Sequence, residues 1–199
     1  NCPVGLSYDR IELEHTGVTL AQMKNVEVVI NGKPVMTFKD GARIEAINDY
    51  YGRPKTAGFL TLHFARPEMK TLEQGRLTSL GTVDVATLAV NIDIDAGAAA
   101  PVIKAHAVQS EPAPLGAFIK VREFQFDASV AGELEISTLP RGPRILAAHF
   151  FKADISKLDV ELDSQKVFSA SKVLGQSIQN TYGRVPQSAS ATHFDTALE

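Results

Sequence analysis

The chain has 199 residues, of which 44% are hydrophobic and 22% are charged, a composition that is typical of a folded globular protein and excludes extensive disorder. The net charge is −3, from 20 basic and 23 acidic residues, so no strong positive field is available to bind nucleic acid directly. The single cysteine, Cys2, excludes an intrachain disulfide and a cysteine-based metal site, and no apolar run reaches the ~20 residues of a membrane-spanning helix.

Apolar residues that alternate with polar ones predict several β-strands in the first half of the chain. This period of two places one face of each strand in a core and the other in water. The predicted strands lie at residues 11–13, 28–30, 35–38, 60–64 and 88–94. Between the second and third of them, Asn31-Gly32 is the dipeptide that favours a type I′ hairpin turn.

Helices are predicted to be few and short. Thr19 and Gln22 have the spacing of a capping box, which predicts a helical turn that continues to about Asn25. Asp40 fits the N-cap of a second helix, and Gly52 fits its end. The apolar positions of that helix are Ile44, Ile47 and Tyr51. Two further helical segments are predicted, a turn over 68–72 that Pro67 begins and a helix over 165–175.

The second half of the chain carries the same alternation. Strands are predicted at residues 124–126, 134–136 and 158–162, with a turn at Pro140-Arg141-Gly142-Pro143. Residues 109–117 contain two prolines and no periodicity, which is typical of a linker. We therefore expect an all-β protein of two units, 1–108 and 118–199, each an antiparallel sandwich or barrel.

No catalytic constellation is visible in the sequence. The five histidines are His15, His63, His106, His149 and His193, and none lies within five residues of another. A metalloenzyme built on a jelly roll needs two histidines one strand-step apart, so these are predicted to be surface or structural residues. Nucleophile and phosphate-binding motifs are also missing. The protein is therefore predicted not to be an enzyme and to need no cofactor, with calcium as the one candidate ligand.

Asn91, Asp93 and Asp95 are the candidates for that ligand, because alternation places all three on one face of a strand and calcium prefers oxygen ligands. The alternatives are a solvated face or a contact between subunits. A second acidic face at Asp159, Glu161 and Asp163 has the same alternatives. Tyr50-Tyr51 is a candidate stacking platform for a carbohydrate, although core packing of one ring is the alternative.

Four stretches of the sequence resemble the major capsid proteins of corticoviruses, the marine, membrane-containing, icosahedral bacteriophages. They are TGVTLAQMKNVEVVINGKPVMTF (16–38), FLTLHFARPEMK (59–70), LGTVDVATLAVNIDIDAGAAAP (80–101) and LPRGPRILAAHFFKA (139–153). The most specific parts are HFARPEMK and the LGTV…IDIDAGAAAP run, which strand propensity does not explain. The resemblance extends from about Tyr8 to the end of the chain.

The resemblance implies a double jelly roll with a few short helices in loops, with residues 1–108 as the first barrel and 118–199 as the second. It implies a homotrimer of pseudo-hexameric shape that tiles an icosahedral shell over an internal membrane. Neighbouring trimers and minor capsid or membrane proteins would be partners, without direct nucleic-acid binding. The protein would lie in the virion, and in the host cytoplasm before assembly. Family members continue for some tens of residues beyond Glu199, so the second barrel is expected to lack its closing strands, unless a partner chain completes the sheet.

Two other functions stay open at this point. A lectin-like or adhesin-like binding module would share the β-sandwich, and a minor virion protein could share the whole fold. Lys24, Arg43 and Arg66 are candidates for contact with anionic lipid, against a solvated surface as the alternative.

Overall fold

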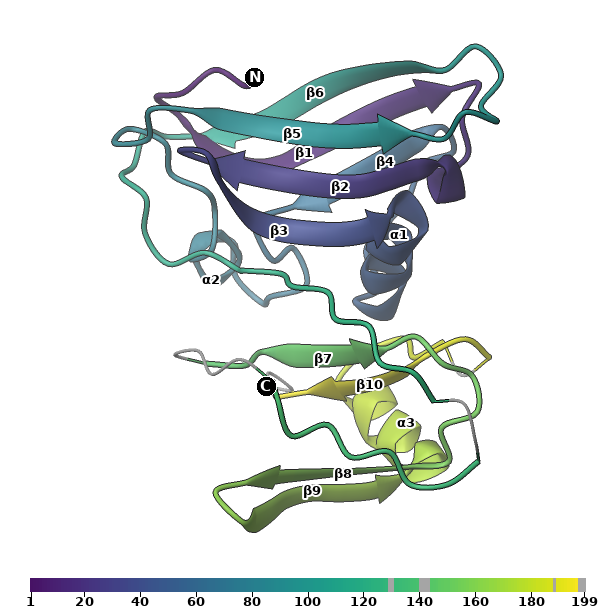
Figure 1. Cartoon of the computed structure of the whole chain (residues 1–199). Coiled ribbons are helices and arrows are strands. Elements are labelled where there is room, and N and C mark those ends of the chain that lie inside the picture. Colours follow the sequence, from purple (N-terminus) through teal and green to yellow (C-terminus); the bar gives the residue numbers. More distant parts are fainter. Residues whose placement is uncertain (129–130, 140–143, 188, 197–199) are drawn as a thin grey trace. The chain divides into compact units, whose positions relative to one another are not determined.

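The protein is described by a computed structural model that covers residues 1–128, 131–139, 144–187 and 189–196 (Figure 1). The chain divides into two compact units, Asn1–Glu123 and Phe124–Glu199. Each unit is described by itself below.

The N-terminal unit is built from two three-stranded antiparallel sheets, with the strand orders β4-β1-β6 and β3-β2-β5 (Figure 1). Its strands are β1 (Ser7–Thr16), β2 (Met23–Ile30), β3 (Lys33–Asp40), β4 (Phe59–His63), β5 (Leu88–Ile94) and β6 (Val102–Ser110). The sheets share one core, to which alternate residues of both contribute. The strands predicted in the first half of the chain all form, and β6 is a strand that the prediction did not include.

The β2–β3 hairpin confirms the turn predicted at Asn31-Gly32. Ile30 pairs with Lys33, so these two residues are the whole loop. Their φ angles are 48° and 75°, the positive values that a type I′ turn requires at both positions. Asn31 also accepts hydrogen bonds through Oδ1 from the backbone N–H groups of Ala86 and Thr87, which ties the hairpin to the start of β5.

Three short helical segments accompany these sheets. The capping box at Thr19 and Gln22 is confirmed, but it opens only the 3₁₀ turn η1 (Leu20–Gln22), because Met23 already begins β2. The Asp40 carboxylate accepts from the backbone N–H of Arg43 at 3.0 Å, so it caps α1 (Gly41–Tyr50) as predicted. The helical turn predicted over 68–72 forms only in part: Met69 N–H donates to the Arg66 carbonyl at 3.1 Å and closes a turn at Pro67, but the helix α2 (Leu72–Arg76) begins later, after the Thr71 cap.

The segment after β6 stays attached to the N-terminal unit. Val121 forms a parallel bridge with Met36 of β3. The Val121 carbonyl accepts from the Thr37 N–H, and the Val121 N–H donates to the Val35 carbonyl, both at 3.1 Å. Within the predicted linker, the Ala113 carbonyl accepts from the backbone N–H of Val83 at 3.1 Å. The residues that follow β6 therefore cover the outer edge of β3 instead of running free.

The C-terminal unit contains two pairs of antiparallel strands and one longer helix. Its elements are β7 (Ala147–Phe150), β8 (Lys157–Leu162), β9 (Gln165–Ser171), α3 (Lys172–Thr181) and β10 (Thr192–Asp195). β8 pairs with β9, and β7 pairs with β10. The strand predicted at 158–162 is confirmed as β8.

Two predictions for this unit are wrong. The helix predicted over 165–175 is wrong for residues 165–171, which form β9, because Asp163 and Ser164 have positive φ angles and close a two-residue hairpin. Its last four residues are helical, since they begin α3. Residues 124–126 and 134–136 form no strand. The alternation would give a strand one apolar face, but no other strand of the described residues pairs with these segments, and Phe124, Phe126 and Leu134 remain 42–50% exposed. The turn predicted at Pro140–Pro143 lies outside the described residues. Nowhere in the described ranges is a helix long and apolar enough to cross a membrane.

Candidate functional site

The two sides of the N-terminal sandwich differ in how they are covered. On one side, α1 packs against β3 and β4, with Ile44 and Tyr50 fully buried, and residue Val121 bridges to β3 (Figure 1). On the other side, β5 and β6 are the outermost strands. Within the described residues, β6 pairs only with β1, and β5 pairs only with β2 apart from one bridge to Cys2. We call this β5/β6 side the open side.

The inner face of the open side is apolar and is not fully covered. Ala105 and Ala107 of β6 lie directly opposite Leu13 and Ile11, which are at most 2% exposed. The two alanines nevertheless remain exposed, as does Ile94 at the end of β5. The open side therefore presents exposed apolar side chains between two strand edges that pair with no further strand in the described residues, which is a surface that natural proteins usually cover.

The outer face of β5 is polar and carries two of the three predicted calcium ligands. Asn91 lies opposite Glu27, and Asp93 lies opposite Lys24. Asn91, Asp93 and Glu27 line one open depression together with Asn25, which also donates through Nδ2 to Asp93 Oδ2 at 2.9 Å. Asn25 has a φ of 46° at an irregularity of β2, and this backbone conformation turns it toward β5.

Asp95 does not join this depression. It follows the last residue of β5, so strand alternation no longer decides where it points. Its Oδ1 accepts from the backbone N–H of Gly97 at 2.9 Å, and its own N–H donates to the Gln22 carbonyl at 2.9 Å. Across the described residues there is no group of three or more His, Cys, Asp or Glu side chains with the geometry of a metal site. Calcium binding at Asn91 and Asp93 therefore stays a prediction.

The second acidic face is partly neutralised by lysines. Lys157, Ser169 and Lys166 all donate to the Asp159 carboxylate, at 2.8–3.0 Å. These hydrogen bonds, that of Lys157 first, hold the pKa of Asp159 well below its usual range. Asp163 is taken up in the β8–β9 turn. This arrangement stabilises the β8–β9 hairpin and takes up the charge of Asp159, whereas cation binding at Glu161 and Asp163 stays a prediction.

Arg66 does not fit its predicted role as a lipid contact. Its side chain is only 12% exposed, and its Nε donates to Glu68 Oε1 at 3.1 Å. Glu68 is 6% exposed and also binds Arg53, which donates from Nε and Nη2 at 3.1 Å each. We call Arg53, Glu68 and Arg66 the buried ion triad. Asn48, outside the triad, accepts a further hydrogen bond from Arg53 Nη1 at 3.1 Å.

The tyrosine pair also serves the interior. Tyr50 is fully buried, and its ring packs edge-to-face on Tyr51 with 5.0 Å between centroids. The Arg53 guanidinium lies 4.7 Å from the centroid of Tyr51. A ring stacked under a guanidinium offers no open platform for a sugar, so the core-packing alternative fits better than the carbohydrate-binding one.

Two histidines that are far apart in the sequence meet in the C-terminal unit. His149 on β7 and His193 on β10 are cross-strand neighbours with 2.8 Å between their Nδ1 atoms. Sequence spacing could not reveal this pair, because the two residues are 44 positions apart and meet only through the register of two four-residue strands. His63, in contrast, lies in the N-terminal unit, where burial and then Arg53 and Arg10 lower its pKa to about 3.

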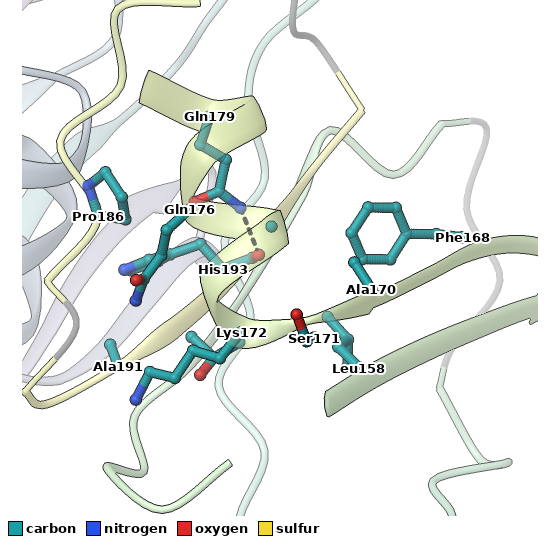
Figure 2. Close-up of a pocket in the computed structure, with 12 residues that line it drawn as sticks. Leu158, Phe168, Ala170, Ser171, Lys172, Gln176, Gln179, Pro186, Ala191 and His193 are labelled. Carbon is teal, nitrogen blue, oxygen red and sulfur yellow. Dashed lines mark hydrogen bonds between the residues drawn. The ribbon is translucent and has the colours of Figure 1, made fainter. Parts of the chain in front are cut away.

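A small cavity adjoins His193 between α3, β9 and β10 (Figure 2). Leu158, Phe168 and Ala170 line it from the hairpin, and Gln176 and Gln179 line it from the helix. Its volume is about 10 Å³, which is room for one water-sized sphere. The cavity is therefore too small for a substrate or cofactor, and the exposed strand edges of the open side are the more prominent candidate for function.

Comparisons with known proteins identify the family to which both halves of the chain are similar. The family model for the viral coat protein P2 N-terminal domain matches residues 1–110, and the model for the viral coat protein P2 C-terminal domain matches residues 118–199. The chain is 35% identical over 171 residues to the major capsid protein P2 of Pseudoalteromonas phage PM2. That alignment covers 82% of this chain and 63% of the relative, so the chain spans less than two thirds of the relative's length.

A solved structure matches as well. The crystal structure of the major capsid protein P2 from bacteriophage PM2 superposes with a TM-score of 0.92 at 32% sequence identity, covering 100% of this chain and 76% of that one. This match, together with the β-rich architecture, confirms the prediction of an all-β jelly-roll protein with few short helices.

Proposed function

Because the chain belongs to the viral coat protein P2 family, we propose that it is the major capsid protein of a bacteriophage and that its role is structural, not enzymatic. The observation that carries this proposal is the match of the whole chain to the PM2 capsid protein with a TM-score of 0.92. A likeness over every described element at 32% identity is more than a shared sandwich architecture would produce.

The proposed mechanism is closure of a shell by repeated association of identical subunits. We propose a homotrimer of pseudo-hexameric shape, because a threefold object of that outline can occupy a hexagonal lattice. Interfaces of permanent assemblies typically bury more than ~2,000 Å² and resemble a core cut in half. The open side supports this proposal, since its free strand edges and accessible alanines have the chemistry of such an interface.

The remaining parts of the proposal concern where the subunit acts. The trimers would contact neighbouring trimers, minor capsid proteins and an internal membrane, in the virion after assembly and in the host cytoplasm before it. The net charge of −3 fits a shell that does not bind nucleic acid directly. A minor virion protein of the same fold is the alternative, and the copy number of the protein in purified particles separates the two.

The experiment that tests the proposal measures the oligomeric state of the chain and of two matched variants. Ala107→Lys places a charge on the inner, apolar face of β6, whereas His106→Lys places the same side chain on the outer face, beside Glu14. By light scattering at micromolar concentration, we expect a trimer for the unsubstituted chain and for His106→Lys. We expect a monomer for Ala107→Lys, because a lysine cannot be buried unpaired in an apolar contact.

The proposal of trimers would be abandoned if the unsubstituted chain were monomeric throughout this concentration range. If both lysine variants formed trimers, the trimer would stand and the open side would be excluded as its interface. Circular dichroism of Ala107→Lys checks that any loss of assembly is not a loss of folding.

A further inference from the structure

Two imidazoles face each other in the middle of the β7–β10 ladder. The Nδ1 atoms of His149 and His193 are 2.8 Å apart, and the ring planes are inclined by 70°. A contact of this length between ring nitrogens is an N–H···N hydrogen bond, which needs a proton on one nitrogen and a lone pair on the other. The two facing nitrogens can therefore hold one proton between them and not two.

His193 of this pair is buried, and His149 is half-buried. His193 is 3% exposed, and Gln179 of α3 donates through Nε2 to its backbone carbonyl at 2.6 Å (Figure 2). The charged groups near it among the described residues are Asp195 on β10, Lys172 on α3 and Arg184 beyond α3. Arg184 Nε binds Asp195 Oδ2 at 3.0 Å, so the one carboxylate is already shared with a cation. The hairpin residues at the adjoining cavity, Leu158, Phe168, Ala170 and Ser171, carry no titratable group.

The contact between these histidines lies where the C-terminal strand is attached. β10 pairs with β7 over four residues, with His193 opposite His149. Beyond them, Thr196 extends the attachment by donating its N–H to the Leu146 carbonyl at 2.8 Å and its hydroxyl to the Ile145 carbonyl at 2.7 Å. Separation of the two rings would therefore disturb the only strand pairing that β10 has within the described residues.

We propose that His149 and His193 form an acid-sensitive clasp, which keeps β10 paired with β7 at neutral pH and releases it when both imidazoles become protonated. Two Nδ1–H groups cannot face each other at hydrogen-bonding distance, and two imidazolium charges repel at this separation. The rings must then move apart, and β10 must leave its place beside β7. This device does not depend on the role proposed for the chain in a capsid.

The direction of the pH dependence follows from proton counting. In released strands each histidine titrates near its ordinary pKa of ~6.5, whereas the closed clasp excludes the second proton. Burial first, and then the neighbouring His149, lower the pKa of His193 to about 3. Release therefore takes up at least one proton between about pH 6.5 and that value. The equilibrium constant for opening should rise about tenfold for each pH unit of acidification in this range.

Hydrogen exchange of the full chain tests the clasp. Exchange is followed by mass spectrometry from pH 7.5 to 4.5 and corrected for the intrinsic pH dependence of amide exchange. We expect the opening constant of peptides covering β7 and β10 to rise about fiftyfold between pH 6.5 and 4.5, because a released histidine is already half protonated at pH 6.5. In His193→Gln this rise should disappear, because an amide can accept from His149 at any pH. The matched control His106→Gln, at an exposed histidine of β6, should retain it.

Two results would overturn the clasp. One is an opening constant of the β7 and β10 peptides that does not change over this pH range in the unsubstituted chain. The other is an unchanged pH dependence in His193→Gln. If that variant does not fold, histidine NMR of the unsubstituted chain decides the matter: one protonated and one unprotonated Nδ1 at pH 7 supports the clasp. Ordinary titration of His193 near pH 6.5 with β10 still protected contradicts it.

Discussion

Glu68 offers the sharpest test of how the N-terminal unit is stabilised. The substitution Glu68→Gln keeps the size of the side chain and one acceptor oxygen, but it removes the charge that lies between Arg53 and Arg66. All three side chains of the buried ion triad are at most 12% exposed, so neither arginine can recover its hydration without a movement of the chain. Removal of one partner from a buried ion pair costs about 3–5 kcal/mol, because an uncompensated charge is left behind.

This magnitude translates into a large shift in melting temperature. For a unit of the size of Asn1–Glu123, a loss of about 3–5 kcal/mol lowers the melting temperature by about 10–20 °C. Glu12→Gln is the matched control, since Arg10 and Glu12 form an ion pair whose side chains are 41% and 30% exposed. An exposed pair of this kind contributes about 0–1 kcal/mol, so the control should unfold close to the unsubstituted chain.

Urea unfolding followed by far-ultraviolet circular dichroism measures both variants, and pH adds a second arm. Burial alone would raise the pKa of Glu68, but Arg53 and then the other donors to its carboxylate hold that pKa below the usual value. A lowered carboxyl pKa contributes stability that is present above the unfolded pKa of ~4.3 and is lost as the pH falls through the folded one. The difference between Glu68→Gln and the unsubstituted chain should therefore shrink in acid. This reasoning would be refuted if, at neutral pH, Glu68→Gln lowered the free energy of unfolding no more than Glu12→Gln does.

Three further predictions concern a glycine, a histidine and a cation. In urea unfolding, Gly17→Ala should lower the free energy of unfolding more than Gly32→Ala does. Both glycines have positive φ angles, but a Cβ at Gly17 would collide with backbone carbonyls of the loop after β5, whereas Gly32 faces open space. The lowered pKa of His63 implies that the free energy of unfolding falls by about 1.4 kcal/mol for each pH unit below pH ~6.5, and His63→Gln should abolish this fall. Equal slopes of unfolding free energy against pH in both proteins would contradict this. Calcium should raise the melting temperature of the chain and of Asp95→Asn but not of Asp93→Asn, and no response to calcium or to a chelator in any of them would remove the calcium prediction.

Sequence patterns predicted best those features that a few neighbouring residues decide. The Asn31-Gly32 turn and the Asp40 cap depend on backbone angles and hydrogen bonds within four positions, so they could be recognised directly. Strand alternation was equally informative about faces: Asn91 and Asp93 do line one depression. Asp95 does not line it, because alternation ends with the strand at Ile94.

Features that depend on pairing between distant strands could not be predicted in this way. Residues 124–126 alternate as a strand should but pair with no strand among the described residues, while the short strands β7 and β10 carry almost no pattern and pair with each other. The turn that makes β9 a strand was missed because neither Asp163 nor Ser164 is a glycine, although both adopt positive φ angles. For the same reason, the contact between His149 and His193 follows from register and not from spacing.

The stretches that strand propensity could not explain now have a physical explanation. HFARPEMK supplies His63, Arg66 and Glu68, and two of these belong to the buried ion triad. The IDIDAGAAAP run turns back from β5 so closely that only glycine fits at position 17 against its carbonyls. In both cases the unusual residues make long-range polar or steric contacts at the ends of strands. A sequence scan by periodicity is insensitive to such contacts, because their partners lie elsewhere in the chain. In this protein, the parts of the sequence that most resembled a known family are therefore those whose residues are held by the tertiary structure and not by local preference.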